Sequence, residues 1–427
     1  MKLFEHQVKA LDDTKDRNRC AYYLDMGLGK TFVGSEKMKR LGSRVNLVVC
    51  QKSKVQDWIE HFVNIVHGYE VCDMTTKSGY SVFINGGSRT AVNIVGIINY
   101  DLIFRRPEIL KLQDFTLMLD ESSLIQNETA KRSKFILKMN PKNVILLSGT
   151  PTAGKYEKLW SQLKLLGWSI SKKLYYSQYV EMDWIEDKSS GFRIPKVTGY
   201  KNVDRLKYKL SQYGAVFQKS EDVFNLPTQQ ITTIKTAVPK EYKKFMQDEI
   251  ITIDEREFIG DTVLSKRIYS RMICGYLNKA RLEAFKDLVQ STEDRLIVFY
   301  NFNDELYRLI QIVNNAERPV SIVNGHEKDL AAYENADNSV TFIQYQAGAM
   351  GLNLQKANKV IYFSLTERSE LYEQSKKRIH RIGQEKTCFY YVMICPGTVE
   401  EHILQTLKLR KDYTDELFTE YQQNYNW

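Results

Sequence analysis

The chain has 427 residues, enough for two or three domains of about 150 residues each. Hydrophobic residues make up 43% of the chain, which is enough to fill packed cores. No apolar run is as long as a membrane-spanning helix, which needs about 18 residues. The net charge of +9 suits a nucleic-acid partner without proving one. The N-terminus does not resemble a signal peptide, and the six cysteines form no Cys-x-x-Cys pair. We therefore expect a soluble, cytoplasmic protein with free thiols and no zinc site, rather than a membrane or disulfide-stapled secreted protein.

In the N-terminal third, short runs rich in β-branched residues alternate with charged, helix-like segments. The predicted strands are residues 20–24, 45–50, 92–98, 115–120 and 143–147. Their nearly continuous hydrophobicity indicates strands buried on both faces, as in a parallel sheet flanked by helices. We predict one complete α/β domain over residues 1–155.

Residues 156–290 carry few strand signals but many aromatic and lysine residues, and we interpret them as a mostly helical insertion and linker. One further strand is predicted there, at 229–237. The strand rhythm then returns at 295–300, 319–323, 340–345, 358–363 and 388–394. We predict a second parallel-sheet domain over residues 291–427 that ends in a charged helix, which makes the fold α/β with two such domains in tandem.

A phosphate-binding loop is predicted at residues 24–31, between the first strand and the following helix. Gly27 and Gly29 allow a tight turn that aims backbone N–H groups at phosphate oxygens. In such a loop Lys30 reaches the outer phosphates and the Thr31 hydroxyl holds Mg²⁺. A chance glycine turn is the alternative, which the following Lys-Thr and helix disfavour.

An acidic pair, Asp120 and Glu121, ends the predicted strand 115–120. An aspartate at the carboxyl end of a buried strand lies where it can hold a metal ion beside the phosphates. The neighbouring glutamate can then polarise an attacking water. The alternative is a surface acidic pair, which is common at strand ends.

The basic stretch 374–384 contains Arg378 and Arg381, three positions apart. On a helix they would share one face, from which they could stabilise the charge that develops on a γ-phosphate. A basic helix exposed to solvent is an equally good interpretation of this stretch alone.

In their order along the chain, these segments resemble the motifs of the Swi/Snf-type ATPases, a branch of helicase superfamily two with paired RecA-like domains. The similar stretches are Leu3-Phe-Glu-His-Gln7, Asp25-Met-Gly-Leu-Gly-Lys-Thr31, Asp120-Glu121, Leu147-Ser-Gly-Thr-Pro151, Gln346-Ala-Gly-Ala-Met-Gly-Leu-Asn-Leu354 and 374–384. The Arg-Ile-Gly-Gln ending of the last stretch is the most family-specific. In place of the family's His after the acidic pair stand Ser122 and Ser123, which leaves open how that box is coupled to the Ser-Gly-Thr-Pro motif. The chain resembles a minimal viral or bacterial form, which would place it in a host cytoplasm if viral.

The resemblance implies ATP and Mg²⁺ as cofactors, bound between the two RecA-like domains. It implies catalytic roles for Lys30, Asp120, Glu121, Arg378 and Arg381, and metal binding by Thr31 and Asp120. The implied nucleotide contacts are Gln7, Asp25, Met26, Gly27, Leu28, Gly29, Lys30, Thr31 and Gly351. The implied DNA contacts are Ser53, Lys54, Asn99, Tyr100, Asn301 and Gln346.

The function that the resemblance implies is ATP-driven movement along double-stranded DNA, or remodelling of a DNA-bound protein, without strand separation. A strand-separating helicase acting on DNA or RNA is one alternative. A nucleic-acid-binding protein that uses ATP as a conformational switch is another. The sequence assigns no oligomeric state.

Overall fold

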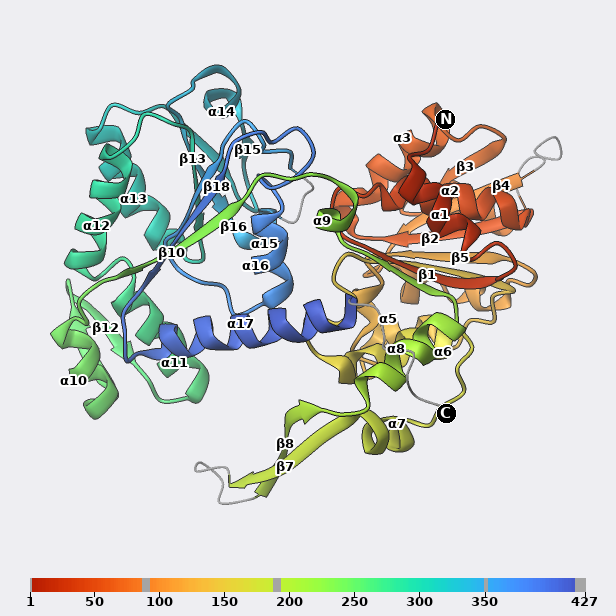
Figure 1. Ribbon diagram of the computed structural model, residues 1–427, viewed down its shortest axis with the longest axis horizontal. Coiled ribbons are helices and arrows are strands. Elements are labelled where there is room, and N and C mark those ends of the chain that lie inside the picture. Colours follow the sequence, from red (N-terminus) through yellow and green to blue (C-terminus); the bar gives the residue numbers. More distant parts are fainter. Residues whose placement is uncertain (1, 87–92, 187–192, 349–351, 419–427) are drawn as a thin grey trace. The chain divides into compact units, whose positions relative to one another are not determined.

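The computed structural model describes residues 2–86, 93–186, 193–348 and 352–418. The chain divides into two compact units: Met1–Val223 with Asp412–Trp427, and Phe224–Lys411. Each unit contains a central sheet with helices packed on it (Figure 1). Because the division follows Val223, the segment predicted as an insertion contributes residues to both units.

The first unit is built on a seven-stranded sheet of order β3-β4-β2-β5-β6-β1-β9, in which every pairing is parallel. Its strands are β1 (Arg19–Leu24), β2 (Val45–Cys50), β3 (Tyr69–Asp73), β4 (Asn93–Asn99), β5 (Thr116–Asp120), β6 (Asn143–Leu147) and β9 (Ala215–Gln218). The five predicted strands are confirmed as β1, β2, β4, β5 and β6. These strands are almost wholly buried, because helices cover both faces of a parallel sheet.

The helices of the first unit are α1 (Glu5–Asp12), α2 (Lys30–Leu41), α3 (Val55–Asn64), α4 (Lys77–Ile84), α5 (Lys131–Ile136), α6 (Trp160–Leu165), α7 (Lys172–Tyr179), α8 (Val203–Gln212) and α9 (Ser220–Val223). Helix α2 follows β1 directly and packs on β6 and β5. Parallel strands end at the same edge of a sheet, so the loops after β1, β5 and β6 gather at one edge. These loops carry the predicted site.

The second unit repeats this arrangement with the strand order β10-β18-β17-β13-β16-β14-β15. Its strands are β10 (Gln229–Lys235), β13 (Leu296–Tyr300), β14 (Val320–Val323), β15 (Lys328–Asp329), β16 (Val340–Gln344), β17 (Lys359–Tyr362) and β18 (Cys388–Ile394). Its helices are α10 (Lys240–Asp248), α11 (Val263–Cys274), α12 (Lys279–Gln290), α13 (Asn303–Asn315), α14 (Ala331–Asn335), α15 (Tyr345–Gly348), α16 (Ser369–Lys376) and α17 (Val399–Phe418). Among the described residues of this seven-stranded sheet, the β14–β15 pair is antiparallel and the other pairings are parallel. The predicted tandem of two parallel-sheet α/β domains is confirmed.

The segment between the predicted domains is less helical than its sequence indicates. It includes the hairpins β7 (Val180–Glu186) with β8 (Arg193–Tyr200) and β11 (Ile250–Ile253) with β12 (Arg256–Ile259). It also supplies β9 to the first sheet and β10 to the second. Strands β7 and β8 expose residues on both faces, so their sequence lacks the apolar alternation that marks a half-buried strand.

The C-terminal end of α17 belongs to the first unit, although the helix begins in the second. The Tyr413 ring meets the Tyr200 ring edge-on at 4.8 Å, and Tyr200 stacks on Tyr156 at 4.4 Å. The Tyr156 hydroxyl donates a hydrogen bond of 2.6 Å to the Tyr413 carbonyl oxygen. Lys219 and Asp415 form an ion pair of 3.3 Å. The first unit is therefore assembled from both ends of the chain.

In the part of the chain that the structure describes, every helix is too short or too polar to span a lipid bilayer.

Candidate functional site

The predicted phosphate loop connects β1 to α2, as its sequence indicates. Gly27 and Gly29 have φ angles of +89° and +73°, a left-handed conformation that favours glycine. Gly29 is the N-cap of α2, so the loop presents the start of this helix, with its unpaired N–H groups, to the edge of the sheet. A Cβ atom on Gly29 would lie 2.2 Å from the Gln7 side-chain nitrogen, so any other residue there would also have to displace the Gln7 amide.

Lys30 lies at the centre of the site. Its Nζ donates hydrogen bonds to the backbone oxygens of Leu24 at 2.9 Å and Asp25 at 3.2 Å. A Cβ atom on Gly149 would lie 3.2 Å from this Nζ, so the loop after β6 passes beside the lysine. Thr31 follows Lys30 in the first turn of α2, which is where a P-loop places its metal-binding hydroxyl.

Ser220, at the start of α9, holds the phosphate loop in place. The Asp25 carboxylate accepts hydrogen bonds from the backbone N–H groups of Met26 at 2.8 Å and Ser220 at 3.3 Å. The Ser220 hydroxyl donates to the Met26 carbonyl oxygen at 3.0 Å. Sequence analysis missed Ser220, because it follows a four-residue strand that carries no clear apolar pattern.

The N-terminal helix places Gln7 against the same loop. Its buried side-chain amide donates to the Leu28 carbonyl oxygen at 3.1 Å, and its Oε1 accepts the Phe4 N–H at 3.0 Å. The ring of Phe4 stacks on His6 at 5.9 Å and is 61% exposed. An exposed aromatic surface therefore lies next to the phosphate loop.

The acidic pair stands at the carboxyl end of β5. The Trp58 indole N–H donates to the Asp120 carboxylate at 2.9 Å, and the Tyr100 hydroxyl donates to the Asp120 carbonyl oxygen at 2.9 Å. Burial raises the pKa of Asp120, while the Trp58 hydrogen bond and the charge of Lys30 act in the opposite direction. Because the lysine charge acts on this carboxyl group, the phosphate loop and the acidic pair form one electrostatic site.

Glu121 has a φ angle of +53°, a left-handed conformation that is uncommon for glutamate. Its carboxylate accepts a hydrogen bond of 3.3 Å from the hydroxyl of Ser148, the first residue after β6. Backbone conformations of this kind persist where surrounding contacts impose them, and they gather at functional sites.

A glutamine bridges the acidic-pair segment and the Ser-Gly-Thr-Pro motif. The Gln162 Oε1 accepts hydrogen bonds from the Ser122 hydroxyl at 2.7 Å and the Tyr23 hydroxyl at 3.0 Å. The same amide donates to the Pro151 carbonyl oxygen at 2.9 Å. Ser122 and Gln162 are fully buried, so this connection is internal. Ser123, which is half-buried, is not part of it. No sequence signal marks Gln162, which lies on a short helix outside the motifs.

The four predicted DNA contacts of the first unit fall into two pairs. Ser53 is exposed and Lys54 is half-buried in an ion pair of 2.6 Å with Asp57. Asn99 and Tyr100 are buried, at 8% and 2% exposure. The Asn99 Oδ1 accepts the N–H of Asp101 at 3.1 Å, and the Tyr100 hydroxyl is the Asp120 support described above.

In the second unit, the Asn301 amide donates hydrogen bonds to the Ser364 hydroxyl at 2.9 Å and the Leu365 carbonyl oxygen at 3.2 Å. It therefore fastens the end of β13 to the loop after β17. Gln346 is exposed. Gly351 lies outside the described residues.

Arg378 and Arg381 are not on a helix, which corrects the premise that they share a helical face. Helix α16 ends at Lys376, and the chain then turns up to Gly383, whose φ angle is +89°. The Gln384 amide fixes this turn by donating to the Ala357 carbonyl oxygen at 2.8 Å. Arg378 is 2% exposed, and partial burial lowers the pKa of Arg381.

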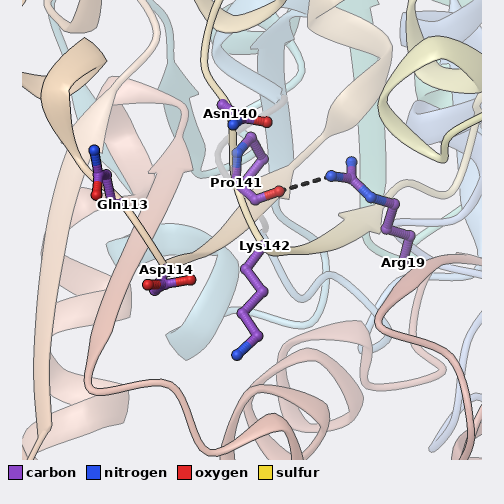
Figure 2. A pocket seen from close by; sticks show the side chains of 6 residues that line it. All are labelled: Arg19, Gln113, Asp114, Asn140, Pro141 and Lys142. Atoms are coloured by element: carbon purple, nitrogen blue, oxygen red, sulfur yellow. Dashed lines mark hydrogen bonds between the residues drawn. The ribbon is translucent and has the colours of Figure 1, made fainter.

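A shallow hollow of about 410 Å³ lies at the opposite, amino-terminal edge of the first sheet (Figure 2). It is lined by Arg19, Gln113, Asp114, Asn140, Pro141 and Lys142. The Arg19 guanidinium donates to the carbonyl oxygens of Pro141 at 2.7 Å and Leu165 at 2.6 Å. The guanidinium donors of Arg19 are thus engaged with the backbone. The hollow lies on the sheet edge away from the phosphate loop.

Comparison with known proteins gives matches along most of the chain. The SNF2-related domain matches residues 14–280, and the helicase conserved C-terminal domain matches residues 280–383. A SWI/SNF-related matrix-associated actin-dependent regulator of chromatin, subfamily A member 1, of Mus musculus is 24% identical over 437 residues, covering 91% of this chain and 40% of the relative. An uncharacterized ATP-dependent helicase of Mycoplasma pneumoniae is 22% identical over 429 residues, covering 93% of this chain and 40% of the relative.

Among solved structures, the Sulfolobus solfataricus SWI2/SNF2 ATPase core in complex with dsDNA has 20% sequence identity and a TM-score of 0.46, covering 97% of this chain and 92% of that chain. The chain spans about 40% of the length of the curated relatives that it matches. The SNF2-related domain alone accounts for more than half of the residues and includes the phosphate loop and the acidic pair. The chain belongs to the SNF2-related family.

Proposed function

We propose that this chain hydrolyses ATP and uses the energy to move along double-stranded DNA without separating the strands. The observation that carries the hydrolysis part of the proposal is the arrangement at one sheet edge, where Lys30 lies beside Gly149 in the loop after β6 and Asp120 ends the neighbouring strand β5. A phosphate loop with its lysine and a neighbouring acidic pair are recurring parts of P-loop ATPases. Family membership supports the same activity.

The first unit would bind the nucleotide. The N–H groups at the start of α2 and the Lys30 ammonium suit the β- and γ-phosphates, since both supply positive charge at a helix N-terminus. The exposed ring of Phe4, next to Gln7, suits stacking with a purine base. Binding requires Lys30 to exchange its bonds to the loop carbonyl oxygens for phosphate oxygens.

The residues of the site fit a magnesium ion. Thr31 and Asp120 offer a hydroxyl and a carboxylate oxygen, which are ligands that Mg²⁺ prefers. Burial raises the pKa of Asp120, so a cation would relieve an unfavourable buried charge. When bound, Mg²⁺ would neutralise charge that develops between the β- and γ-phosphates.

Glu121 would orient and deprotonate the attacking water. Its left-handed backbone and the Ser148 hydrogen bond hold the carboxylate at the sheet edge next to Asp120. We also propose that Arg378 and Arg381 supply positive charge to the transferred phosphate, as the family resemblance implies.

For DNA we propose contacts through the exposed side chains Ser53 and Gln346 and through the Lys54 ammonium. Asn99, Tyr100 and Asn301 would act through backbone groups or by shaping the loops, because their side chains are engaged internally. Phosphate contacts of this kind are independent of sequence and weaken as salt rises. A protein bound to the DNA would then be the target that movement displaces.

The decisive experiment is steady-state ATP hydrolysis without polymer and with duplex DNA, single-stranded DNA or RNA. We expect stimulation by duplex DNA, displacement of a third strand from a triplex, and no separation of the duplex. Preference for single strands or RNA, with strand separation, would instead identify a helicase. ATP binding without turnover under all conditions would identify an ATP-dependent switch.

The site assignment is tested by Lys30→Ala and Glu121→Gln. We expect both to abolish turnover, with ATP binding retained by Glu121→Gln. Glu60→Gln, an exposed position on α3, is the matched control and should hydrolyse ATP normally. We expect Arg381→Ala to bind ATP but hydrolyse it slowly. Normal hydrolysis by Lys30→Ala or Glu121→Gln would refute the assignment.

A further inference from the structure

Two cysteines far apart in the sequence meet in the interior of the second unit. Cys274 ends α11 and Cys395 directly follows β18, 121 positions later. Both are fully buried. Their sulfur atoms and a carboxylate oxygen of Glu400 all lie within 4.8 Å of one another. The proposed ATPase mechanism uses none of these groups.

The surroundings of Cys395 favour a thiolate. Its sulfur lies 3.3 Å from the Asn278 side-chain nitrogen, 3.5 Å from an Arg281 guanidinium nitrogen and 3.4 Å from the Thr236 hydroxyl. Two backbone carbonyl oxygens, at 3.7 and 3.8 Å, are placed to accept the proton when Cys395 is a thiol. Two side-chain N–H donors, one of them charged, are thus directed at the sulfur atom, and the Thr236 hydroxyl, which also donates to the Ile394 carbonyl oxygen at 3.3 Å, lies beside it.

The pKa values of the two thiols are shifted in opposite directions. The hydrogen bond from Cys274 lowers the pKa of Cys395; burial opposes this effect and the Arg281 charge supports it. The same hydrogen bond, followed by burial, raises the pKa of Cys274. A thiolate beside a protonated thiol is the arrangement that reactive dithiol pairs use.

A metal ion fits this cluster poorly. Arg281 binds both oxygens of Glu400, one of them at 2.7 Å, and Glu400 also accepts the Cys395 N–H at 2.9 Å. The carboxylate is therefore already neutralised by the guanidinium. A cation bound between the sulfur atoms would therefore gain Glu400 as a ligand only by breaking this buried ion pair.

We propose that Cys274 and Cys395 are a reversible oxidation site that forms a disulfide with a small peroxide as oxidant. The Cys395 thiolate attacks one peroxide oxygen: an S–O bond forms, the O–O bond breaks, and the leaving hydroxide becomes water by taking from solvent the proton that the Cys395 thiol released when it ionised. Cys274 then attacks the Cys395 sulfur, so that an S–S bond forms and the S–O bond breaks. Hydroxide leaves with the Cys274 proton as a second water. Two thiols are oxidised and one peroxide is reduced to two waters.

The cross-link would fasten α11 to the end of β18. Helix α11 also carries Arg267 and Arg271, whose guanidinium groups lie 2.7 and 3.5 Å from the Glu367 carboxylate in the loop after β17. Closing a loop of 121 positions restricts the unfolded chain strongly, so oxidation should raise the thermal stability of the second unit.

The test is hydrogen peroxide treatment of the full chain, followed by non-reducing peptide mapping and thiol counting. We expect one disulfide between the peptides of Cys274 and Cys395, a mass lower by about 2 Da, and full reversal by dithiothreitol. Two of the six thiols should be lost. Cys395 should react at least about tenfold faster than Cys388, whose pKa burial raises to about 11.

Variants separate the pair from general oxidation. Cys274→Ala should form a sulfenic acid at Cys395, more slowly because the Cys274 hydrogen bond is gone, and no disulfide, whereas Cys388→Ala should still form the disulfide. A bulky aromatic disulfide reagent should leave native Cys395 unmodified, because only a small oxidant enters the buried site. Equal oxidation of all six thiols, or an unreactive Cys395 in the native wild-type chain, would overturn the proposal. So would stoichiometric zinc binding that Cys274→Ala and Cys395→Ala each abolish.

Discussion

Replacing Trp58 with phenylalanine tests whether the hydrogen bond from Trp58 to the proposed metal ligand Asp120 affects the binding of Mg²⁺. The indole N–H donates to the Asp120 carboxylate at 2.9 Å, and phenylalanine removes this donor while keeping the ring against Phe62. Hydrogen bonds to charged groups contribute about 1.5–3 kcal/mol. Burial raises the pKa of Asp120, but the residue keeps some exposure to solvent, so water replaces part of the lost hydrogen bond and the low end of this range applies. About 1.5 kcal/mol corresponds to a factor of roughly 10 in affinity.

We therefore expect Trp58→Phe to require roughly tenfold more Mg²⁺ for half-maximal ATP hydrolysis, with turnover largely restored at saturating Mg²⁺. The assay is steady-state hydrolysis titrated with Mg²⁺ at fixed ATP. Trp160→Phe is the matched control, since its indole N–H donates to the Ile170 carbonyl oxygen instead. An unchanged Mg²⁺ requirement in a folded Trp58→Phe protein would refute the reasoning, as would an equal change in the control.

Four further predictions concern buried contacts. Gly149→Ala should lower turnover several-fold without unfolding, measured by hydrolysis and circular dichroism, because the new Cβ would crowd the P-loop ammonium at 3.2 Å. Gln162→Leu should leave hydrolysis without DNA unchanged and reduce its stimulation by DNA about tenfold, because the amide joins the two loops; equal loss in both assays would contradict this. Glu400→Gln should lower the free energy of unfolding of the second unit by about 3–5 kcal/mol in urea unfolding, because it leaves the Arg281 charge buried without a partner. The double variant Arg281→Met with Glu400→Leu should lower it by less, because it removes both charges. Burial raises the pKa of Glu305, so its contribution to stability is present at acidic pH and lost as pH rises through that pKa; Glu305→Gln should flatten this dependence in thermal unfolding from pH 4 to 8.

Strands that are buried on both faces could be predicted from sequence, because their hydrophobicity is continuous. Runs such as Val45–Cys50 and Leu296–Tyr300 were located to within a residue. The hairpin Val180–Glu186 with Arg193–Tyr200 could not, since both faces are exposed and its apolar residues follow no period. The local hydrophobic pattern of a strand reflects which of its faces is buried, and few residues of this hairpin are buried.

The order of motifs predicted which loops meet at the sheet edge, but not how their side chains are occupied. Tyr100 was predicted from the family pattern as a DNA contact, and its hydroxyl supports the Asp120 backbone. The helix expected through Arg378 ends earlier, at Lys376, where packing of the Gln384 amide fixes a turn. Contacts between distant segments, such as Gln162 with Ser122, leave no trace in local sequence.

The return of α17 to the first unit has a consequence for synthesis on the ribosome. Tyr413 and Asp415, which pack on Tyr200 and Lys219, emerge only after the whole of Phe224–Lys411. At about 5–20 residues per second, this intervening stretch takes roughly 10–40 s to translate. Meanwhile the aromatic surface around Tyr156 and Tyr200 lacks its covering segment. The nascent first unit therefore stays incomplete during this interval, and its uncovered aromatic surface is then accessible to a chaperone.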